Sequence, residues 1–260
     1  MLEIKNVTIS YGDRPTVKKF SMTLKKGEIA SIVGESGSGK TTVIRAVLGL
    51  LPGGGKATEG DILFEGKSLL ENTAEEWRNL RGTDMSMIFQ DSGAMLNPIR
   101  KIGSVFVEYI RTHEKISRKA AWEKGREMLE QMRLPSSDNI MKSYPFQLSG
   151  GMRQRVGIAM AMTFQPKLLL ADEPTSALDV TTQAQIVRQM MELREEWGTS
   201  IIMVTHNLGA AAYMSDQILV MKEGQIADTG SRDQILKGGR SVYTQELLEA
   251  VPSLGGERYV

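Results

Sequence analysis

The chain has 260 residues, with 32 Lys and Arg against 31 Asp and Glu and a formal net charge of +1 at pH 7. This length suits one large domain or a domain with a subdomain. The balanced charge excludes a global electrostatic field that would recruit nucleic acid or anionic lipid. The absence of cysteine excludes disulfides and cysteine-ligated clusters. Residues 1–5 lack a signal pattern and no apolar run approaches a membrane span, so we expect any membrane role to be by docking.

Alternating apolar and polar residues open the chain. Residues 2–11 and 17–24 alternate as half-buried strands do. Residues 25–28, Lys-Lys-Gly-Glu, indicate a hairpin-like break after the second of these strands. We therefore expect an antiparallel β region at the N-terminus.

Residues 34–41 follow the pattern G-x-x-x-x-G-K-[ST], between an apolar run at 29–33 and a helix-like run at 42–50. Glycines at these positions let backbone N–H groups curl around phosphate oxygens, and the following helix points its positive end at the same anion. Lys40 is expected to neutralise the β- and γ-phosphates, and Thr41 to place a hydroxyl on Mg²⁺. The predicted nucleotide-binding residues of this phosphate loop are Gly34, Glu35, Ser36, Gly37, Ser38, Gly39, Lys40, Thr41 and Thr42.

Three further apolar runs, at 85–89, 168–171 and 200–205, are short and dense, as central strands of a parallel sheet are. Residues 181–197 have helical spacing, so strands and helices alternate and predict an α/β fold. Residues 98–147 differ, because charged amphipathic stretches such as 117–132 contain few β-branched residues. We expect a helical insertion there.

Each buried-type strand is followed by a polar residue, and ligands bind beyond the carboxyl ends of parallel strands. Asp172 is expected to hold Mg²⁺, Glu173 to polarise the attacking water, and Gln90 to reach both. His206 is the remaining strand-end candidate. Taken alone, each of these residues also has a structural interpretation, as a turn cap, a solvated side chain or a packed histidine.

Tyr11 and His113 each have a structural interpretation as well. Tyr11 can stack on adenine through its ring face, although an aromatic residue at a strand end is equally a core residue. His113, beside Arg111 and Glu114, is interpreted as a surface residue without a role.

A second glycine-containing segment, residues 148–152, precedes the helix-like run 156–162. Ser149 suits an N-cap, and Gly150-Gly151 let an anion approach the exposed N–H groups, although an ordinary helix start has the same spacing. Two phosphate-type loops in one chain imply either two ligands or one ligand held between two copies.

From residue 2 to about 252 these motifs resemble the ATP-binding subunits of ABC transporters, in the family's order. The resemblance implies a phosphate-loop NTPase (RecA-like) sheet domain with an inserted helical subdomain. It also implies head-to-tail pairing, in which each ATP lies between one phosphate loop and the partner's signature helix. The residues carried over beside the phosphate loop are Tyr11, Gln90, the signature residues Ser149, Gly150, Gly151 and Met152, then Asp172, Glu173, Asp179 and His206.

Within that family the chain looks like the peptide/nickel importer group, because of the segments 87–91, 96–98, 144–152, 171–175 and 243–252. Two departures stand out. Ser92 and Gly93 replace a Pro-containing stretch, and Asn207 stands where the family usually has Asp.

The predicted parts are a RecA-like core at 1–97 and 159–232, a helical subdomain at 98–158 and a C-terminal extension at 233–260. The predicted function is an ATPase with ATP and Mg²⁺ as cofactors, which energises a membrane importer of di- or oligopeptides, nickel or metal chelates. The alternative is a soluble ABC-type ATPase acting on nucleic acid or ribosomes.

The expected partners are a second ATP-binding subunit of the same or a related chain, transmembrane permease subunits and, indirectly, an extracellular solute-binding protein, with no nucleic acid. The expected location is peripheral, on the cytoplasmic face of the cell membrane. The resemblance places a permease helix in the groove by residues 90–103, so that charge at Met95 or Leu96 is expected to uncouple transport.

Overall fold

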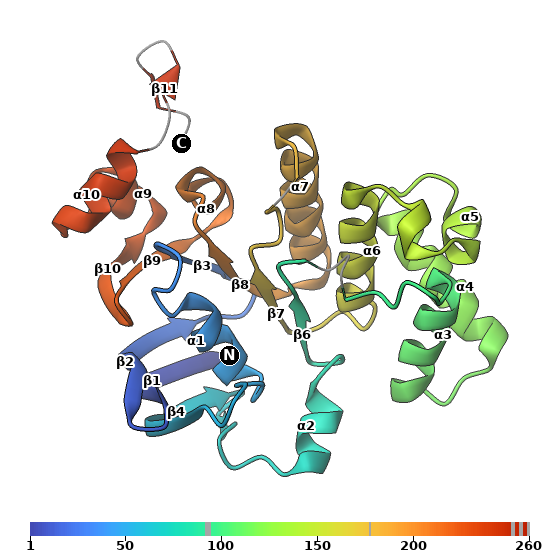
Figure 1. Cartoon of the computed structure of the whole chain (residues 1–260), viewed down its shortest axis with the longest axis horizontal. Helices are drawn as coiled ribbons and strands as arrows, with labels where there is room; N and C mark the ends of the chain where they lie inside the picture. The colour runs from blue at the N-terminus through green and yellow to red at the C-terminus, as the bar shows by residue number, and fades with distance from the viewer. Residues whose placement is uncertain (92–94, 177, 251–252, 255–256, 259–260) are drawn as a thin grey trace. The chain divides into compact units, whose positions relative to one another are not determined.

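The computed structural model describes residues 1–91, 95–176, 178–250, 253–254 and 257–258 (Figure 1). It divides into two compact units, one formed by residues 1–78 and 200–260 and the other by residues 79–199. Ser92, Gly93 and Pro252, which the motif comparison above includes, lie outside the described residues, and so does Ala177, which stands between the predicted site residues Glu173 and Asp179. The predicted four-part division stays a prediction.

The first unit contains an antiparallel sheet in the order β2-β1-β4-β5. Its strands are β1 (Leu2–Tyr11), β2 (Arg14–Leu24), β4 (Lys56–Phe64) and β5 (Lys67–Ser68). In β2 the side chains of Phe20, Met22 and Leu24 are buried and alternate with exposed ones, and Val17 is buried beyond a shift in register. The predicted antiparallel N-terminal region is confirmed.

A second group of strands in this unit is mostly parallel. Strand β3 (Ile29–Val33) pairs in parallel with β8 (Ser200–Thr205) and with β9 (Gln217–Lys222), and β10 (Gln225–Ser231) is antiparallel to β9. All residues of β3 and β8 are buried, as expected of central strands. The prediction of a hairpin-like break at 25–28 was wrong, because β2 and β3 belong to different sheets. Residues 25–28 form a turn, which the Glu28 N–H closes by donating to Lys25 O at 3.2 Å.

The helices of the first unit lie beside these strands. Helix α1 (Lys40–Val47) packs against both β8 and the antiparallel sheet, and α8 (Leu208–Met214) packs against β3 and β8. Near the C-terminus, α9 (Arg232–Leu236) packs against β9 and β10, and α10 (Val242–Glu249) packs against β10. The remaining elements near the unit boundary and the C-terminus are α2 (Ala74–Leu80), β11 (Ser253–Leu254) and β12 (Glu257–Arg258).

In the second unit, β6 (Met85–Ile88) and β7 (Leu168–Asp172) pair in parallel, and β7 is buried throughout. Residues 98–147 are helical, as predicted, and α4 is capped by Ser117, whose hydroxyl accepts the Ala120 N–H. The helices of this unit are α3 (Ile102–His113), α4 (Arg118–Gln131), α5 (Ser137–Lys142), the 3₁₀ turn η1 (Pro145–Gln147), α6 (Gly150–Met162) and α7 (Val180–Trp197).

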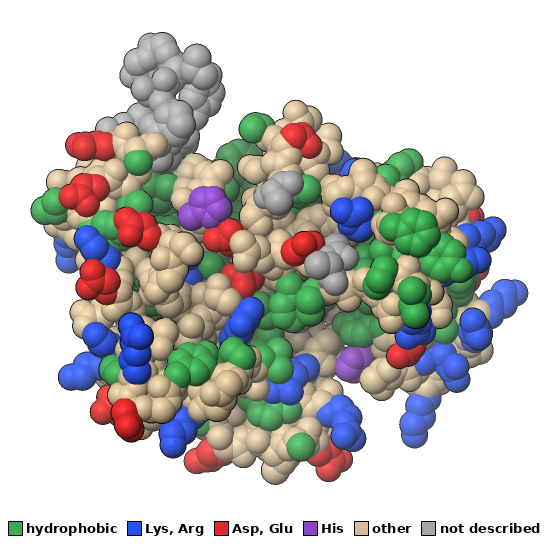
Figure 2. Space-filling view, in the orientation of Figure 1, with side chains coloured by type: hydrophobic (Ala, Val, Ile, Leu, Met, Phe, Trp, Pro, Cys, Tyr) green, Lys and Arg blue, Asp and Glu red, His purple; other side chains and the backbone are tan. Residues whose placement is uncertain are grey.

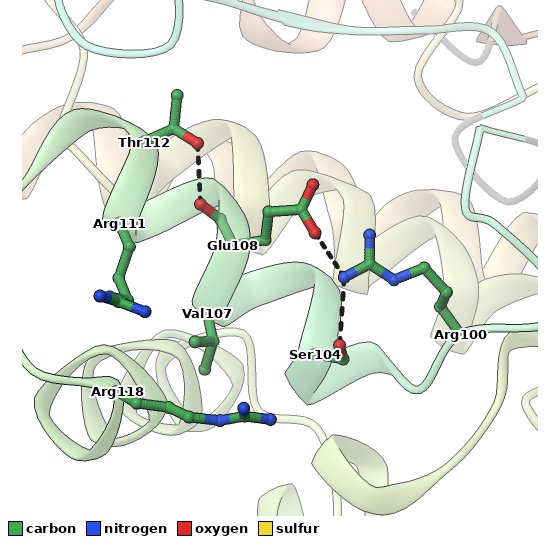
Figure 3. A pocket seen from close by; sticks show the side chains of 7 residues that line it. All are labelled: Arg100, Ser104, Val107, Glu108, Arg111, Thr112 and Arg118. Carbon is green, nitrogen blue, oxygen red and sulfur yellow. Dashed lines mark hydrogen bonds and ion pairs between the residues drawn. The ribbon is translucent and has the colours of Figure 1, made fainter.

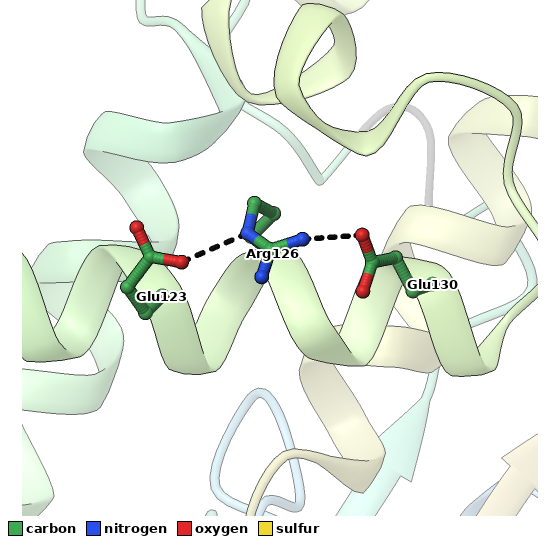
Figure 4. A network of polar contacts seen from close by, with 3 residues as sticks. All are labelled: Glu123, Arg126 and Glu130. Atoms are coloured by element: carbon green, nitrogen blue, oxygen red, sulfur yellow. Dashed lines mark hydrogen bonds and ion pairs between the residues drawn. The ribbon is translucent and has the colours of Figure 1, made fainter.

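Helices α3, α4 and α5 pack on one another, and α4 also packs on α6 (Figure 1). One face of α4 is buried through Ala121, Gly125, Met128 and Leu129. Its other face carries charge, and there Arg126 pairs with both Glu123 and Glu130 (Figure 4). Because these ion pairs lie on the surface of the helix, each contributes little to stability.

His113, interpreted above as a surface residue, is half-buried and packs against aromatic rings. Its ring lies edge-on to Tyr109 and Phe164, with centroids 5.3 Å and 5.2 Å away. Burial lowers the pKa of His113. A Cβ on Gly82 would lie 2.7 Å from its Nε2, so the histidine is a packing residue of the second unit.

No helix in the described parts of the chain is both long and apolar enough to cross a membrane.

Candidate functional site

The phosphate loop joins the end of β3 to the start of α1, where the sequence predicts it. Gly34 has φ +154° and a Cβ there would lie 2.2 Å from Met221 O, so no other residue fits. Gly39 precedes α1 with φ 99° and no side-chain cap. A glycine-preceded helix start without a side-chain cap is the kind of helix terminus that binds phosphate in proteins.

Lys40 is nearly buried, at 5% exposure. Its ammonium donates to Gly34 O at 2.8 Å and to Glu35 O at 2.6 Å, with Ser38 Oγ at 3.4 Å. A buried ammonium needs such partners because an unpaired one is costly. The loop thus holds a fixed positive charge inside its own curve, as phosphate neutralisation requires.

Tyr11 and His206 belong to the same unit as the loop. Tyr11, the last residue of β1, is half-buried, and a Cβ on Gly55 would lie 2.5 Å from its ring. His206 directly follows β8 and is exposed. Asn207 caps α8 by accepting the Ala210 N–H at 3.1 Å, so the departure from Asp keeps a capping oxygen in place.

The predicted acid pair lies at the end of β7 in the second unit. Asp172 is the last residue of that strand and is 3% exposed. Glu173 follows with φ 45°, a left-handed conformation that costs free energy for a residue with a side chain. Gln90 Nε2 donates to Glu173 Oε2 at 3.3 Å, so the structure brings these two predicted residues together.

Two neighbours hold the segment after Glu173, and sequence reasoning missed both of these contacts. Ser176 Oγ donates to Glu173 O at 3.0 Å and to Gln90 O at 3.4 Å. Gln154 of α6, 6% exposed, donates through Nε2 to Pro174 O at 2.7 Å. Buried amide-to-carbonyl bonds of this kind are costly to break. The strained Glu173 backbone is therefore fixed by its surroundings.

Ser149 caps α6, as predicted, since its hydroxyl accepts the Met152 N–H at 3.3 Å. Gly151 packs so closely that a Cβ would lie 2.8 Å from Thr182 Cγ2. Asp179 caps α7, because its carboxylate accepts hydrogen bonds from the Thr182 N–H at 2.9 Å and from the Thr182 hydroxyl at 2.7 Å. These bonds lower the pKa of Asp179. Its predicted contact with nucleotide stays a prediction.

The oxygen-bearing residues predicted for Mg²⁺ fit a metal that is held by few protein ligands together with phosphates and water. They are the hydroxyl of Thr41, the amide of Gln90 and the carboxylate of Asp172. Within the described residues there is no cluster of three His, Cys, Asp or Glu that would hold a metal by itself. Thr41 belongs to the first unit, and Gln90 and Asp172 belong to the second, so their shared metal site stays a prediction.

A pocket of about 410 Å³, which sequence reasoning did not predict, lies along α3 at the start of α4 (Figure 3). Arg100 pairs with Glu108 and Ser104, and Arg111 Nε donates to Ile116 O at 3.2 Å. Lys and Arg gather over this part of the surface (Figure 2), where residues 98–143 contain ten Lys and Arg against six Asp and Glu. The residues lining the pocket are Arg100, Ser104, Val107, Glu108, Arg111, Thr112 and Arg118. Its lining carries three arginines against one glutamate.

Comparison with known proteins supports the family resemblance that the motifs indicate. The ABC transporter family model matches residues 17–176. The chain is 45% identical over 98% of its length to the oligopeptide transport ATP-binding protein OppD of Bacillus subtilis (strain 168), of which it spans 72%. It is 42% identical over 98% of its length to the glutathione import ATP-binding protein GsiA of Escherichia coli (strain K12), of which it spans only 42%.

Among solved structures, the chain is similar to the dimeric post-hydrolysis state of the ATP-binding cassette MJ0796 bound to ADP and Pi. The TM-score is 0.79 at 29% identity, covering 89% of this chain and 99% of that one. The predicted α/β phosphate-loop fold and the resemblance stated from the motifs are confirmed.

Proposed function

Because the chain belongs to the ABC transporter family, we propose that it is the ATP-hydrolysing subunit of a membrane importer whose cargo is a peptide. The observation that carries the proposal is the match over 98% of the chain to an oligopeptide transport ATP-binding protein. The second relative is named for glutathione, which is a tripeptide. Nickel, part of the predicted cargo class, is named by neither relative.

The chemistry of the proposal is phosphoryl transfer to water, in which positioning and charge neutralisation do most of the work. The loop amides and Lys40 bind the phosphates, a role supported by the fixed ammonium contacts at 2.8 Å and 2.6 Å. Glu173 orients and deprotonates the attacking water, and Gln90, bonded to it at 3.3 Å, keeps its carboxylate in place. His206 contacts the γ-phosphate, and Tyr11 stacks on the base.

Bound Mg²⁺, held by Thr41, Gln90 and Asp172, would neutralise charge on the β- and γ-phosphates. The position of Asp172 supports this role, because it ends β7 and ligands bind beyond the carboxyl ends of parallel strands.

The site is completed by another subunit in this proposal. Ser149 and the amides at the start of α6 bind the ATP of a partner ATP-binding subunit, which is either a second copy or a related chain. Two observations support this: Ser149 presents the start of a 13-residue helix, and the cassette MJ0796 is dimeric in the structure that holds ADP and Pi.

The permease docks on the second unit, at the cytoplasmic face of the membrane. Met95 and Ile99, 63% and 82% exposed, supply apolar contacts, and the arginine-lined pocket along α3 receives an acidic side chain. Leu96, where the sequence analysis expects an added charge to uncouple transport, is only 6% exposed. A charge at Leu96 would disturb folding, so the test belongs to its exposed neighbours.

We expect Ile99→Asp to abolish the permease's stimulation of ATP hydrolysis while the ATPase rate of the separate subunit stays within about twofold, because exposed substitutions perturb folding little. ATPase assays on the subunit with and without permease measure both rates. Leu70→Asp, at another exposed apolar residue, is the control that keeps coupling. Full stimulation of the Ile99→Asp variant would place the contact elsewhere.

Cargo is tested in proteoliposomes that contain the permease, the solute-binding protein and this chain. We expect ATP-driven uptake of labelled short peptides. Uptake of Ni²⁺ without peptide uptake would contradict the peptide cargo. Stimulation of the ATPase by DNA, RNA or ribosomes in place of a permease would favour the soluble alternative.

A further inference from the structure

The C-terminal helix α10 reaches the phosphate loop. Tyr243, in the first turn of α10, accepts the Glu35 N–H through its hydroxyl at 3.1 Å, across 208 positions of sequence. The side chain is 7% exposed, so the contact is shielded from water. No motif in the sequence connects this tyrosine with nucleotide.

The hydrogen bond clamps one particular peptide group. The Glu35 N–H and the Gly34 carbonyl belong to the same planar unit, which rotates as a whole. Tyr243 holds its N–H at 3.1 Å, and Lys40 holds its carbonyl oxygen at 2.8 Å. The orientation of this peptide therefore sets the direction from which the Lys40 ammonium is held.

The start of α10 is itself anchored. The Asp228 carboxylate accepts from the Ser241 N–H at 3.0 Å and the Thr244 hydroxyl at 3.1 Å, as well as from the Arg240 N–H. Burial alone would raise the pKa of Asp228, but these hydrogen bonds outweigh it and lower the pKa. The acceptor is thus ionised and strong at neutral pH.

The ring of Tyr243 is held from another side as well. Lys222 Nζ lies 4.5 Å from its centroid, at the end of β9. Met221, the residue before Lys222, packs against the phosphate loop, because a Cβ on Gly34 would lie 2.2 Å from its carbonyl oxygen. Burial raises the pKa of the Tyr243 phenol, and the charge of Glu35 raises it too, so the hydroxyl stays protonated at neutral pH.

We propose that Tyr243 is a positioning residue for the phosphate loop, through which α10 tunes the affinity of the chain for nucleoside triphosphate. The inference rests on the proposed function, since it concerns the same loop. Without the hydroxyl the Gly34–Glu35 peptide keeps its contact with Lys40 but loses the one with Tyr243, so the direction in which Lys40 is held is less fixed. The C-terminal region thereby becomes part of the nucleotide site.

The test is Tyr243→Phe, which keeps the ring and removes the hydroxyl. We expect the KM for ATP, and the Kd for a non-hydrolysable ATP analogue, to rise about threefold to tenfold, as loss of one hydrogen bond predicts. We expect kcat to stay within about twofold, because the hydroxyl acts on binding rather than on the reacting water. Tyr213→Phe, at a tyrosine of the same unit that is 57% exposed, is the control without effect.

Unchanged KM and Kd in a Tyr243→Phe protein with normal circular dichroism and melting temperature would overturn the inference. A fall in kcat at unchanged KM would overturn it as well. If Lys40→Ala loses ATP while Tyr243→Phe behaves as the unsubstituted protein, only the inference fails. If Lys40→Ala also binds ATP normally, the proposed function fails.

Discussion

Replacing Glu173 by Gln is expected to lower kcat for ATP hydrolysis by about 100-fold to 10,000-fold, the range of a lost general base. The amide keeps the shape of the side chain and its contact with Gln90, which is 3.3 Å in the unsubstituted protein, but it takes no proton from water. Binding of ATP is expected to stay within about threefold, because the phosphates are held by the loop. Steady-state phosphate release and equilibrium ATP binding measure the two quantities.

Glu195→Gln is the matched control, since Glu195 is exposed on α7 and its substitution is expected to leave hydrolysis unchanged. If Glu173→Gln hydrolyses ATP at a near-normal rate, Glu173 is not the residue that activates water. If it loses ATP binding as well as turnover, its role is structural.

Replacing Lys40 by Ala is expected to weaken ATP binding by about 10-fold to 100-fold or more, because one hydrogen bond to a charged group contributes about 1.5–3 kcal/mol. The substitution removes the buried ammonium and also releases the carbonyl oxygens of Gly34 and Glu35, which it holds at 2.8 Å and 2.6 Å. Isothermal titration with Mg-ATP measures the loss.

Lys26→Ala removes an exposed ammonium of the same unit, with an expected effect on affinity of less than about twofold. Adenosine, which lacks phosphates, should bind the Lys40→Ala and unsubstituted proteins alike. Equal affinity of both proteins for Mg-ATP would contradict the phosphate-loop assignment.

The parts of the site that the sequence could predict are those whose chemistry is local. In the phosphate loop, the spacing from Gly34 to Lys40 is itself the geometry, because consecutive amides and one helix start form the cradle. The acid pair follows from an apolar strand with polar residues at its end, and Ser149 follows from helix-capping chemistry.

The parts that the sequence could not predict depend on contacts between distant segments. Gln154 supports Pro174 across 20 positions, and Tyr243 supports Glu35 across 208. An amide or a phenol in a helix has no pattern that names its partner. For the same reason the packing of His113 against Phe164 and the burial of Leu96 were missed.

The fold shows the same division. The alternation in β2 is visible in its residues, and so is the helical character of residues 98–147. The turn at 25–28 has the composition of a hairpin, but the choice of sheet for β3 depends on β8 and β9, which lie more than 160 positions away in sequence. Sheet partners of such separation are set by tertiary packing rather than by local residues.

The central claim is that one ATP is held by this chain's phosphate loop and by the Ser149 helix start of another ATP-binding subunit. Light scattering of the Glu173→Gln chain with Mg-ATP, alone and mixed with any related ATP-binding subunit of its importer, tests it most directly. We expect the mass to rise from one 28.7 kDa chain to a pair in one of the two samples, and to stay single without nucleotide. A single-chain mass in both samples at saturating Mg-ATP would contradict the claim.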